Sequence, residues 1–187
     1  GIVLIAIFKL ESDKDEVVPK FTAVQSYFGR WMLYVVMGLI QSLIICVGDL
    51  LLLGVQCKSP AAFIFAGLFT SFVYVNIIYT FTVSFGDVGK AICVVLLVMQ
   101  VAGSGGTFPI EVAPEIFQKI YPFLPFTHSM TAMRECVAGF YQYTYWAELG
   151  IMCLFLLASL FLGLVLRKPV IRLNELFIEK LEDTKLM

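Results

Sequence analysis

Long apolar stretches with almost no charged residues alternate with short polar segments along this chain. Residues 31–55 contain one charged residue, Asp49, whereas residues 61–85 and 149–166 contain none. A helix of about 18 or more apolar residues is long enough to cross the roughly 30 Å hydrocarbon core of a bilayer. The pattern therefore predicts membrane-spanning helices over these three ranges.

Two other apolar segments are shorter. Residues 91–102 follow a predicted tight turn at 86–90 and lead into a glycine-rich run, so we expect the next span over 91–108. Residues 1–8 would rise only about 12 Å as a helix. We interpret them as the end of a span that begins upstream, and we expect the chain to be the C-terminal fragment of a longer protein.

Residues 110–140 have a different character, because prolines and charged side chains are mixed there. Prolines interrupt helices, and both broken backbone and charges are costly where lipid surrounds them. We therefore predict two short re-entrant helices on the outer side, at about 112–121 and 127–140, before the last span. The expected fold is all-α, a polytopic transmembrane helix bundle.

Composition favours a membrane protein over a soluble enzyme or a nucleic-acid-binding protein. Hydrophobic residues make up 60% of the chain and charged residues 14%, against roughly 25% charged residues in soluble domains. The formal net charge is −1, which gives no basic surface for nucleic acid. We interpret residues 1–187 as a single membrane domain in contact with the lipid bilayer.

The distribution of Lys and Arg predicts the orientation of the chain. Cytoplasmic loops of membrane proteins carry an excess of these residues, and most of the 13 in this chain fall on one side of the predicted spans. We expect a multi-pass protein of the cell membrane, with the linker 9–30 and the C-terminal tail 167–187 in the cytoplasm. The residues on that side are Lys9, Lys14, Lys20, Arg30, Lys90, Arg167, Lys168, Arg172, Lys180 and Lys185.

The second half of the linker is amphipathic. Residues 21–28 predict a short interfacial helix that begins near Phe21 and turns Phe21, Val24 and Phe28 toward the membrane or neighbouring helices.

The glycine-rich run at residues 103–106 is the sharpest local feature. Glycine lets the backbone turn or pack closely, and a broken helix at membrane depth needs protein or a water-filled cavity around it. One interpretation is a gate at the outer end of a pathway, and the other is a helix end followed by a flexible turn. The candidate gate or pathway residues are Asp49, Gly103, Ser104, Gly105, Gly106, Arg134 and Glu135.

Some of these candidates have a simpler explanation. Asp49 lies about 9 Å inside the end of its predicted span, where a charge is costly, but it could also bond water near the interface. Arg134 and Glu135, together with Glu111 and Glu115, could form a solvated and partly paired face.

Gln41 and Asn76 are candidates for a polar pair between two spans. The predicted turn at 56–60 makes the flanking spans an antiparallel hairpin and places the two amides at similar depth. A buried amide in hydrocarbon seeks a partner. The alternative is that each amide bonds within its own helix or faces a cavity.

The chain contains no constellation that indicates covalent chemistry, so we expect no enzyme, cofactor or metal site. His128 is the single histidine, and a packed or interfacial role is favoured for it. The five cysteines include no C-x-x-C pair. A disulfide between Cys57 and Cys136 stays open, because sequence does not show proximity.

Three motifs together resemble a known family. Gly103-Ser104-Gly105-Gly106-Thr107-Phe108-Pro109 is followed by Tyr121-Pro122-Phe123-Leu124-Pro125-Phe126-Thr127 and by Ala132-Met133-Arg134-Glu135. This series is similar to the C-terminal membrane domain of the YhgE/Pip (phage infection protein) family. The order of elements also resembles the permease fold of type-2 ABC exporters.

The resemblance implies an integral membrane component of an export or secretion system, acting as a homodimer. It also implies an upstream extracellular domain that this chain lacks and, because the chain has no ATPase motif, a separate ATPase subunit. Residues 21–28 would then correspond to a coupling helix that docks on the ATPase, or else to a membrane-surface anchor. The alternative function is a membrane anchor and scaffold for an extracellular receptor domain used by phage or by type VII secretion.

Overall fold

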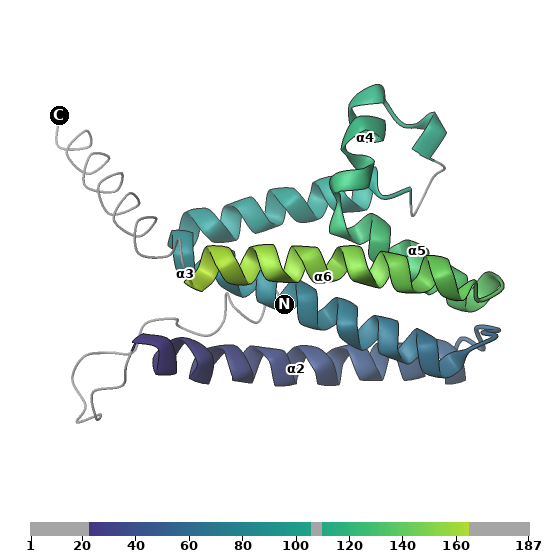
Figure 1. Ribbon diagram of the computed structural model, residues 1–187, viewed down its shortest axis with the longest axis horizontal. Coiled ribbons are helices and arrows are strands. Elements are labelled where there is room, and N and C mark those ends of the chain that lie inside the picture. Colours follow the sequence, from purple (N-terminus) through teal and green to yellow (C-terminus); the bar gives the residue numbers. More distant parts are fainter. Residues whose placement is uncertain (1–22, 106–109, 165–187) are drawn as a thin grey trace.

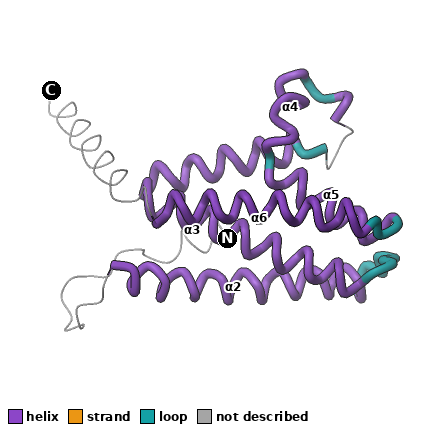
Figure 2. Tube along the Cα trace, viewed as in Figure 1, coloured by secondary structure: helices purple, strands orange, loops and turns teal. Residues whose placement is uncertain are grey.

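The computed structural model describes residues 23–105 and 110–164, which form an all-α bundle (Figure 1, Figure 2). Three long helices make up most of it: α2 (Ala23–Leu51), α3 (Pro60–Gly103) and α6 (Gln142–Leu164). The described part contains no strand, and the predicted all-α class is confirmed. The span end predicted at 1–8, the linker before residue 23 and the tail 167–187 lie outside the described residues.

Four short helical elements connect α3 to α6. They are η1 (Ile110–Val112), α4 (Glu115–Ile120), η2 (Tyr121–Phe123) and α5 (Pro125–Ala138). We call residues 110–138 the short-helix unit. In Figure 1 it lies at one end of the bundle, where the second part of α3 ends.

Three helical ranges are long and apolar enough to cross a membrane: Phe28–Leu51, Pro60–Gly86 and Gln142–Gly163. A shorter apolar helix covers Val88–Gly103. Large apolar side chains such as Ile44 on α2 are exposed on the outer faces of these helices, as lipid requires. These are the features of a multi-pass membrane protein.

Helix α2 begins before the predicted span. It runs without interruption from Ala23 to Leu51, so the surface helix predicted at 21–28 is not separate from the span. An isolated glycine costs a helix only about 1 kcal/mol, and Gly29 therefore does not end it. At the other end, α2 stops at Leu51, before the predicted boundary at Val55.

Helix α3 is broken at Gly86. This residue has φ 58° and ψ −129°, a conformation that a side chain would strain. Beyond the break, a Cβ on Gly89 would lie 2.1 Å from the carbonyl oxygen of Phe81, so only glycine allows so close a return. Figure 1 shows the second part of α3 running back along the bundle.

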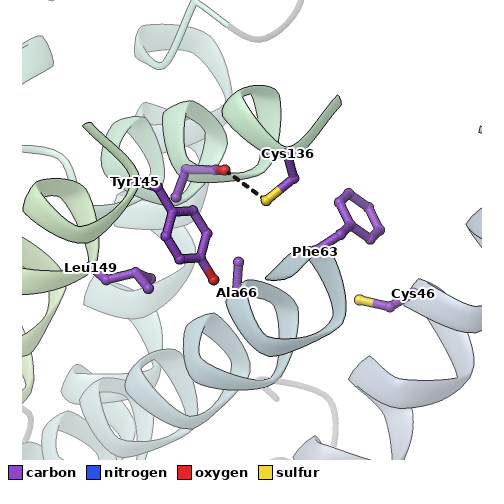
Figure 3. Close-up of a cluster of buried hydrophobic side chains, with 7 residues drawn as sticks. Cys46, Phe63, Ala66, Cys136, Tyr145 and Leu149 are labelled. Carbon is purple, nitrogen blue, oxygen red and sulfur yellow. Dashed lines mark hydrogen bonds between the residues drawn. The ribbon is translucent and has the colours of Figure 1, made fainter. Parts of the chain in front are cut away.

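Two clusters of buried apolar side chains hold the helices together. One lies between α2 and α3 and consists of Tyr34, Val35, Val75 and Tyr79. The other joins α2, α3, α5 and α6, and Figure 3 shows most of its members. In this second cluster the Tyr145 hydroxyl donates a hydrogen bond to the carbonyl oxygen of Ala62, 2.9 Å away. Its members are Cys46, Phe63, Ala66, Ala132, Cys136, Tyr145 and Leu149.

A fully buried amide, Asn76, links all three long helices. The indole N–H of Trp31 on α2 donates to Asn76 Oδ1 at 3.0 Å. Asn76 Nδ2 donates to the hydroxyl of Ser159 on α6. Ser159 in turn donates to the carbonyl oxygen of Leu156, 2.8 Å away. The oxygen and the NH2 group of this buried amide therefore each have a partner on another helix.

Gln41 has a different position. It is exposed on α2, while both amide groups of Asn76 are engaged by Trp31 and Ser159. The structure thus gives Asn76 partners other than Gln41. Similar depth did not bring the two amides together, because Gln41 lies on an outward-facing side of its helix.

The link through Asn76 can be tested by substitution. We expect Asn76→Ala to lower the free energy of unfolding by about 1–2 kcal/mol, because it removes two interhelical hydrogen bonds and leaves their partners unpaired. Gln41→Ala removes an exposed amide and should change the unfolding free energy by less than about 0.5 kcal/mol. Denaturation in detergent micelles measures both. Equal effects of the two substitutions would contradict the link.

Candidate functional site

The end of α3 and helix α5 meet at the glycine-rich segment. Arg134 Nη2 donates a hydrogen bond to the carbonyl oxygen of Gly105 at 2.8 Å. Gly105 has φ +65°, in the left-handed region that glycine adopts most readily. The guanidinium thus holds the backbone just after α3 ends. Two of the candidate gate residues, which lie far apart in the sequence, are brought together here.

Gly103 gives the short-helix unit room to approach α3. A Cβ at this position would lie 3.0 Å from Cδ1 of Leu124 and 3.2 Å from Cδ1 of Phe117. Leu124 is buried and immediately precedes α5, whereas Phe117 belongs to α4. The short-helix unit therefore rests on the last turn of α3 through a contact that a side chain would fill.

Two buried hydroxyl groups beside this contact have no hydrogen-bond partner. Ser104 is 1% exposed and Thr127 is 4% exposed, and both Oγ atoms are unpartnered. Ser104 follows Gly103, and Thr127 lies in the first turn of α5. A buried hydroxyl without a partner costs free energy. The buried polar groups at this end of the bundle are therefore less completely hydrogen-bonded than the amide of Asn76.

The other candidate gate residues have separate surroundings. Glu135 Oε2 accepts a hydrogen bond from the backbone N–H of Tyr141 at 3.4 Å, so Glu135 faces the corner between α5 and α6. Asp49 is half-buried near the end of α2, on a different helix, and its carbonyl oxygen accepts from Val55 N. Gly106 lies outside the described residues.

The face predicted from the acidic residues is paired in part. Lys119 Nζ lies 4.0 Å from Glu115 Oε2, and both side chains are strongly exposed. An exposed pair of this kind contributes at most about 1 kcal/mol. The pair lies on the surface of α4 and does not attach the short-helix unit to the rest of the bundle.

The pairing of His128 with Glu148 was not predicted from the sequence. His128 Nδ1 lies 2.5 Å from Glu148 Oε2, and the imidazole and carboxyl side chains are 10% and 19% exposed. His128 Nε2 also lies 3.0 Å from the carbonyl oxygen of Pro122. The sequence did contain a signal, since Glu148 is the one charged residue within α6. It was overlooked because the span was predicted to begin at Leu149.

The two cysteines considered for a disulfide are neighbours with free thiols. Cys57 Sγ donates to the carbonyl oxygen of Cys136 at 3.0 Å, and Lys58 N donates to the same oxygen at 3.1 Å. Burial raises the pKa of the Cys136 thiol to about 11. These contacts fix the turn before α3 against the end of α5.

The described residues offer no set of side chains suited to binding a metal ion. Within residues 23–105 and 110–164, no group of three or more His, Cys, Asp and Glu side chains could hold an ion.

Comparison with known proteins gives two matches. A family model described as ABC-2 family transporter protein matches residues 20–165. The chain is also 31% identical over 153 residues to the uncharacterized protein YhgE of Bacillus subtilis (strain 168). This match covers 81% of the chain but only 19% of YhgE, so the chain spans less than a fifth of that relative's length. No solved structure matches the chain.

The contact at Gly103 predicts a specific sensitivity to side-chain size. We expect Gly103→Val to destabilise the protein by about 1–3 kcal/mol, because the added methyl groups would push against Leu124 and Phe117. The short-helix unit should also become more susceptible to protease in detergent micelles.

Gly150 provides the matched control on α6. Nothing lies within 4 Å of a Cβ built there, so Gly150→Val should change stability by no more than about 0.5 kcal/mol. Thermal unfolding compares the two variants directly. If Gly103→Val were tolerated as well as Gly150→Val, the short-helix unit would not rest on α3 in the way described.

Proposed function

The chain belongs to the ABC-2 family of transporter membrane proteins, and from this premise we propose that it forms the membrane pathway of an export or secretion system. Family membership makes it a permease-like membrane component. In such a component, the helices of the chain would surround the path of the substrate through the bilayer. The substrate class is left open by this proposal, because the matched relative is far longer than the chain.

One observation carries the proposal, the hydrogen bond from Arg134 to the carbonyl oxygen of Gly105. It joins the short-helix unit to the end of α3 through an exposed side chain, beside the packing of Leu124 and Phe117 against Gly103. The unpartnered hydroxyls of Ser104 and Thr127 would gain partners if water or substrate entered beside this contact. We infer that the short-helix unit is a movable gate and that Arg134 keeps it closed.

The energy for export would come from a separate ATPase subunit. The chain has no G-x-x-x-x-G-K-[S/T] loop with which to bind nucleotide phosphates. We also propose that two copies of the chain act together, since exposed apolar side chains along α2, such as Met37 and Ile44, could pack against a second copy as well as against lipid. The N-terminal part of α2, from Ala23, would then lie near the ATPase.

A second candidate function is a membrane anchor for an extracellular receptor domain. The packed apolar clusters between the helices favour it, because an anchor needs no polar pathway. The small share of YhgE that the chain matches also favours it, since most of that relative lies elsewhere. The two functions make different predictions. An exporter would bind an ATPase and its activity would depend on the gate, whereas an anchor would need neither.

The ATPase partner can be tested by purification. We expect the full-length protein, isolated from its own membranes after mild cross-linking, to bring a nucleotide-binding subunit with it. In that complex, Arg134→Ala should alter the ATPase rate several-fold while membrane insertion stays normal, because the gate no longer closes. Lys119→Ala, which removes an exposed cation from α4, should leave the rate unchanged.

Each outcome has a clear meaning. Absence of a nucleotide-binding subunit would favour the anchor function. An ATPase rate that is the same in both variants and in the unmodified protein would remove the gate from the proposal.

The orientation is a separate proposal with its own test. We place the turn before α3 outside the cell and the C-terminal tail in the cytoplasm, on the basis of the Lys and Arg distribution. In a chain without native cysteines, Ser59→Cys should react with a membrane-impermeant maleimide in intact cells, and Lys180→Cys should react only after the membrane is opened. The reverse pattern would invert the topology.

A further inference from the structure

His128 is held from two sides by groups of other elements. Its Nδ1 lies 2.5 Å from Glu148 Oε2 on α6, and its Nε2 lies 3.0 Å from the carbonyl oxygen of Pro122 in η2. The ring of Phe155 on α6 lies beside the imidazole, with centroids 6.1 Å apart. The imidazole therefore connects the beginning of α5 to both η2 and α6.

The two contacts determine where protons must be. A carbonyl oxygen can only accept, so Nε2 carries a hydrogen and donates it to Pro122. The lone pair of Nδ1 and a carboxylate oxygen would repel each other at the observed separation unless a proton lay between them. The contact with Glu148 therefore contains one proton, either as imidazolium with carboxylate or as neutral imidazole with carboxylic acid.

We propose that His128 and Glu148 form a proton-binding site that fastens the first turn of α5 to both α6 and η2 only while the proton is bound. Loss of the proton leaves a neutral imidazole with a single N–H for two acceptors, the carboxylate of Glu148 and the carbonyl oxygen of Pro122. One of the two contacts is then lost, and the first turn of α5 is held less firmly. The ligand of this site is the proton itself, and the site does not depend on which substrate the protein exports.

The elements packed against α5 are α6, α3 and η2. Beside Glu148, α6 contributes Tyr145 and Cys153. Helix α3 contributes Tyr74, whose ring contacts that of Phe126, and η2 contributes Tyr121. These are tyrosine and cysteine side chains, which ordinarily carry no charge at neutral pH.

Charged groups near the short-helix unit have other partners. On α5 itself, Arg134 donates to Gly105 and Glu135 accepts from Tyr141. On α4, Glu115 pairs with Lys119. Lys58 lies at the opposite end of α5, where its backbone N–H bonds Cys136 O, and Lys90 lies beyond the Gly86 break, so position rather than pairing separates these two from His128. Among the described residues, Glu148 is therefore the charged partner of His128.

The direction of the pH effect follows from this chemistry. The proton is present at low pH and is lost as the pH rises, so α5 should be held most firmly to α6 under mildly acidic conditions. The attachment of the first turn of α5 should therefore weaken as the pH rises.

The test uses amide hydrogen exchange of the chain in lipid nanodiscs over the range of about pH 5–8. After correction for intrinsic exchange, protection of residues 121–132 should fall by about tenfold as the pH rises, the factor expected for loss of one charge-assisted hydrogen bond. Glu148→Gln should abolish this pH dependence, because its amide N–H can donate to Nδ1 at every pH. Glu115→Gln, which removes an exposed carboxylate from α4, should behave like the unmodified chain.

A second variant and a second readout keep the proposal testable if Glu148→Gln does not fold. His128→Asn places an amide donor near the position of Nδ1, and its protection should likewise be independent of pH. Nitrogen NMR of the chain labelled at histidine, which occurs once in the sequence, should show the Nδ1 signal changing over the same pH range as the protection. A pH-independent profile in the unmodified chain, or an unchanged pH dependence in both substituted chains, would overturn the proposal.

Discussion

The arrangement of the bundle depends on one constraint: the buried amide of Asn76 must find its hydrogen-bond partners within the protein, because hydrocarbon offers it none. Both groups of the amide are engaged, one by Trp31 on α2 and the other by Ser159 on α6. These bonds fix the three long helices relative to one another at one level. Toward the other end, the apolar cluster around Ala66 and Tyr145 joins the same helices to α5. The first part of α3 thus becomes a fixed frame for the remainder.

The candidate site is built on this frame. Gly86 returns the second part of α3 along the bundle, and α3 ends at Gly103 against Leu124 and Phe117. The Arg134 bond to Gly105 adds one exposed hydrogen bond to this contact. The helices are therefore firmly linked around Asn76, where the polar groups are hydrogen-bonded. They are linked more weakly at the end of α3, where the hydroxyls of Ser104 and Thr127 have no partner. This contrast supports the proposal that the short-helix unit is the part that moves.

The sequence pattern predicted the helical class because uncharged apolar stretches have few alternatives in lipid. It also singled out Gly103, Gly105 and Arg134, although the bond between the last two joins residues far apart in the sequence and could not be read from spacing. The similar predicted depth of the two residues in the membrane suggested Gln41 as the partner of Asn76. Depth does not determine which side of its helix a residue faces. Glu148 was overlooked because sequence places helix ends only to within a few residues.

The coupling of α2 to α6 through Asn76 is tested most directly by a double-mutant cycle on the two residues that bond to it from those helices. Trp31→Phe and Ser159→Ala each remove one bond to Asn76, and unfolding free energies are measured for the single and double variants. We expect a coupling of about 0.5 kcal/mol or more between these sites, which disappears when the cycle is repeated in an Asn76→Ala background. Strictly additive effects in the presence of Asn76 would contradict this coupling.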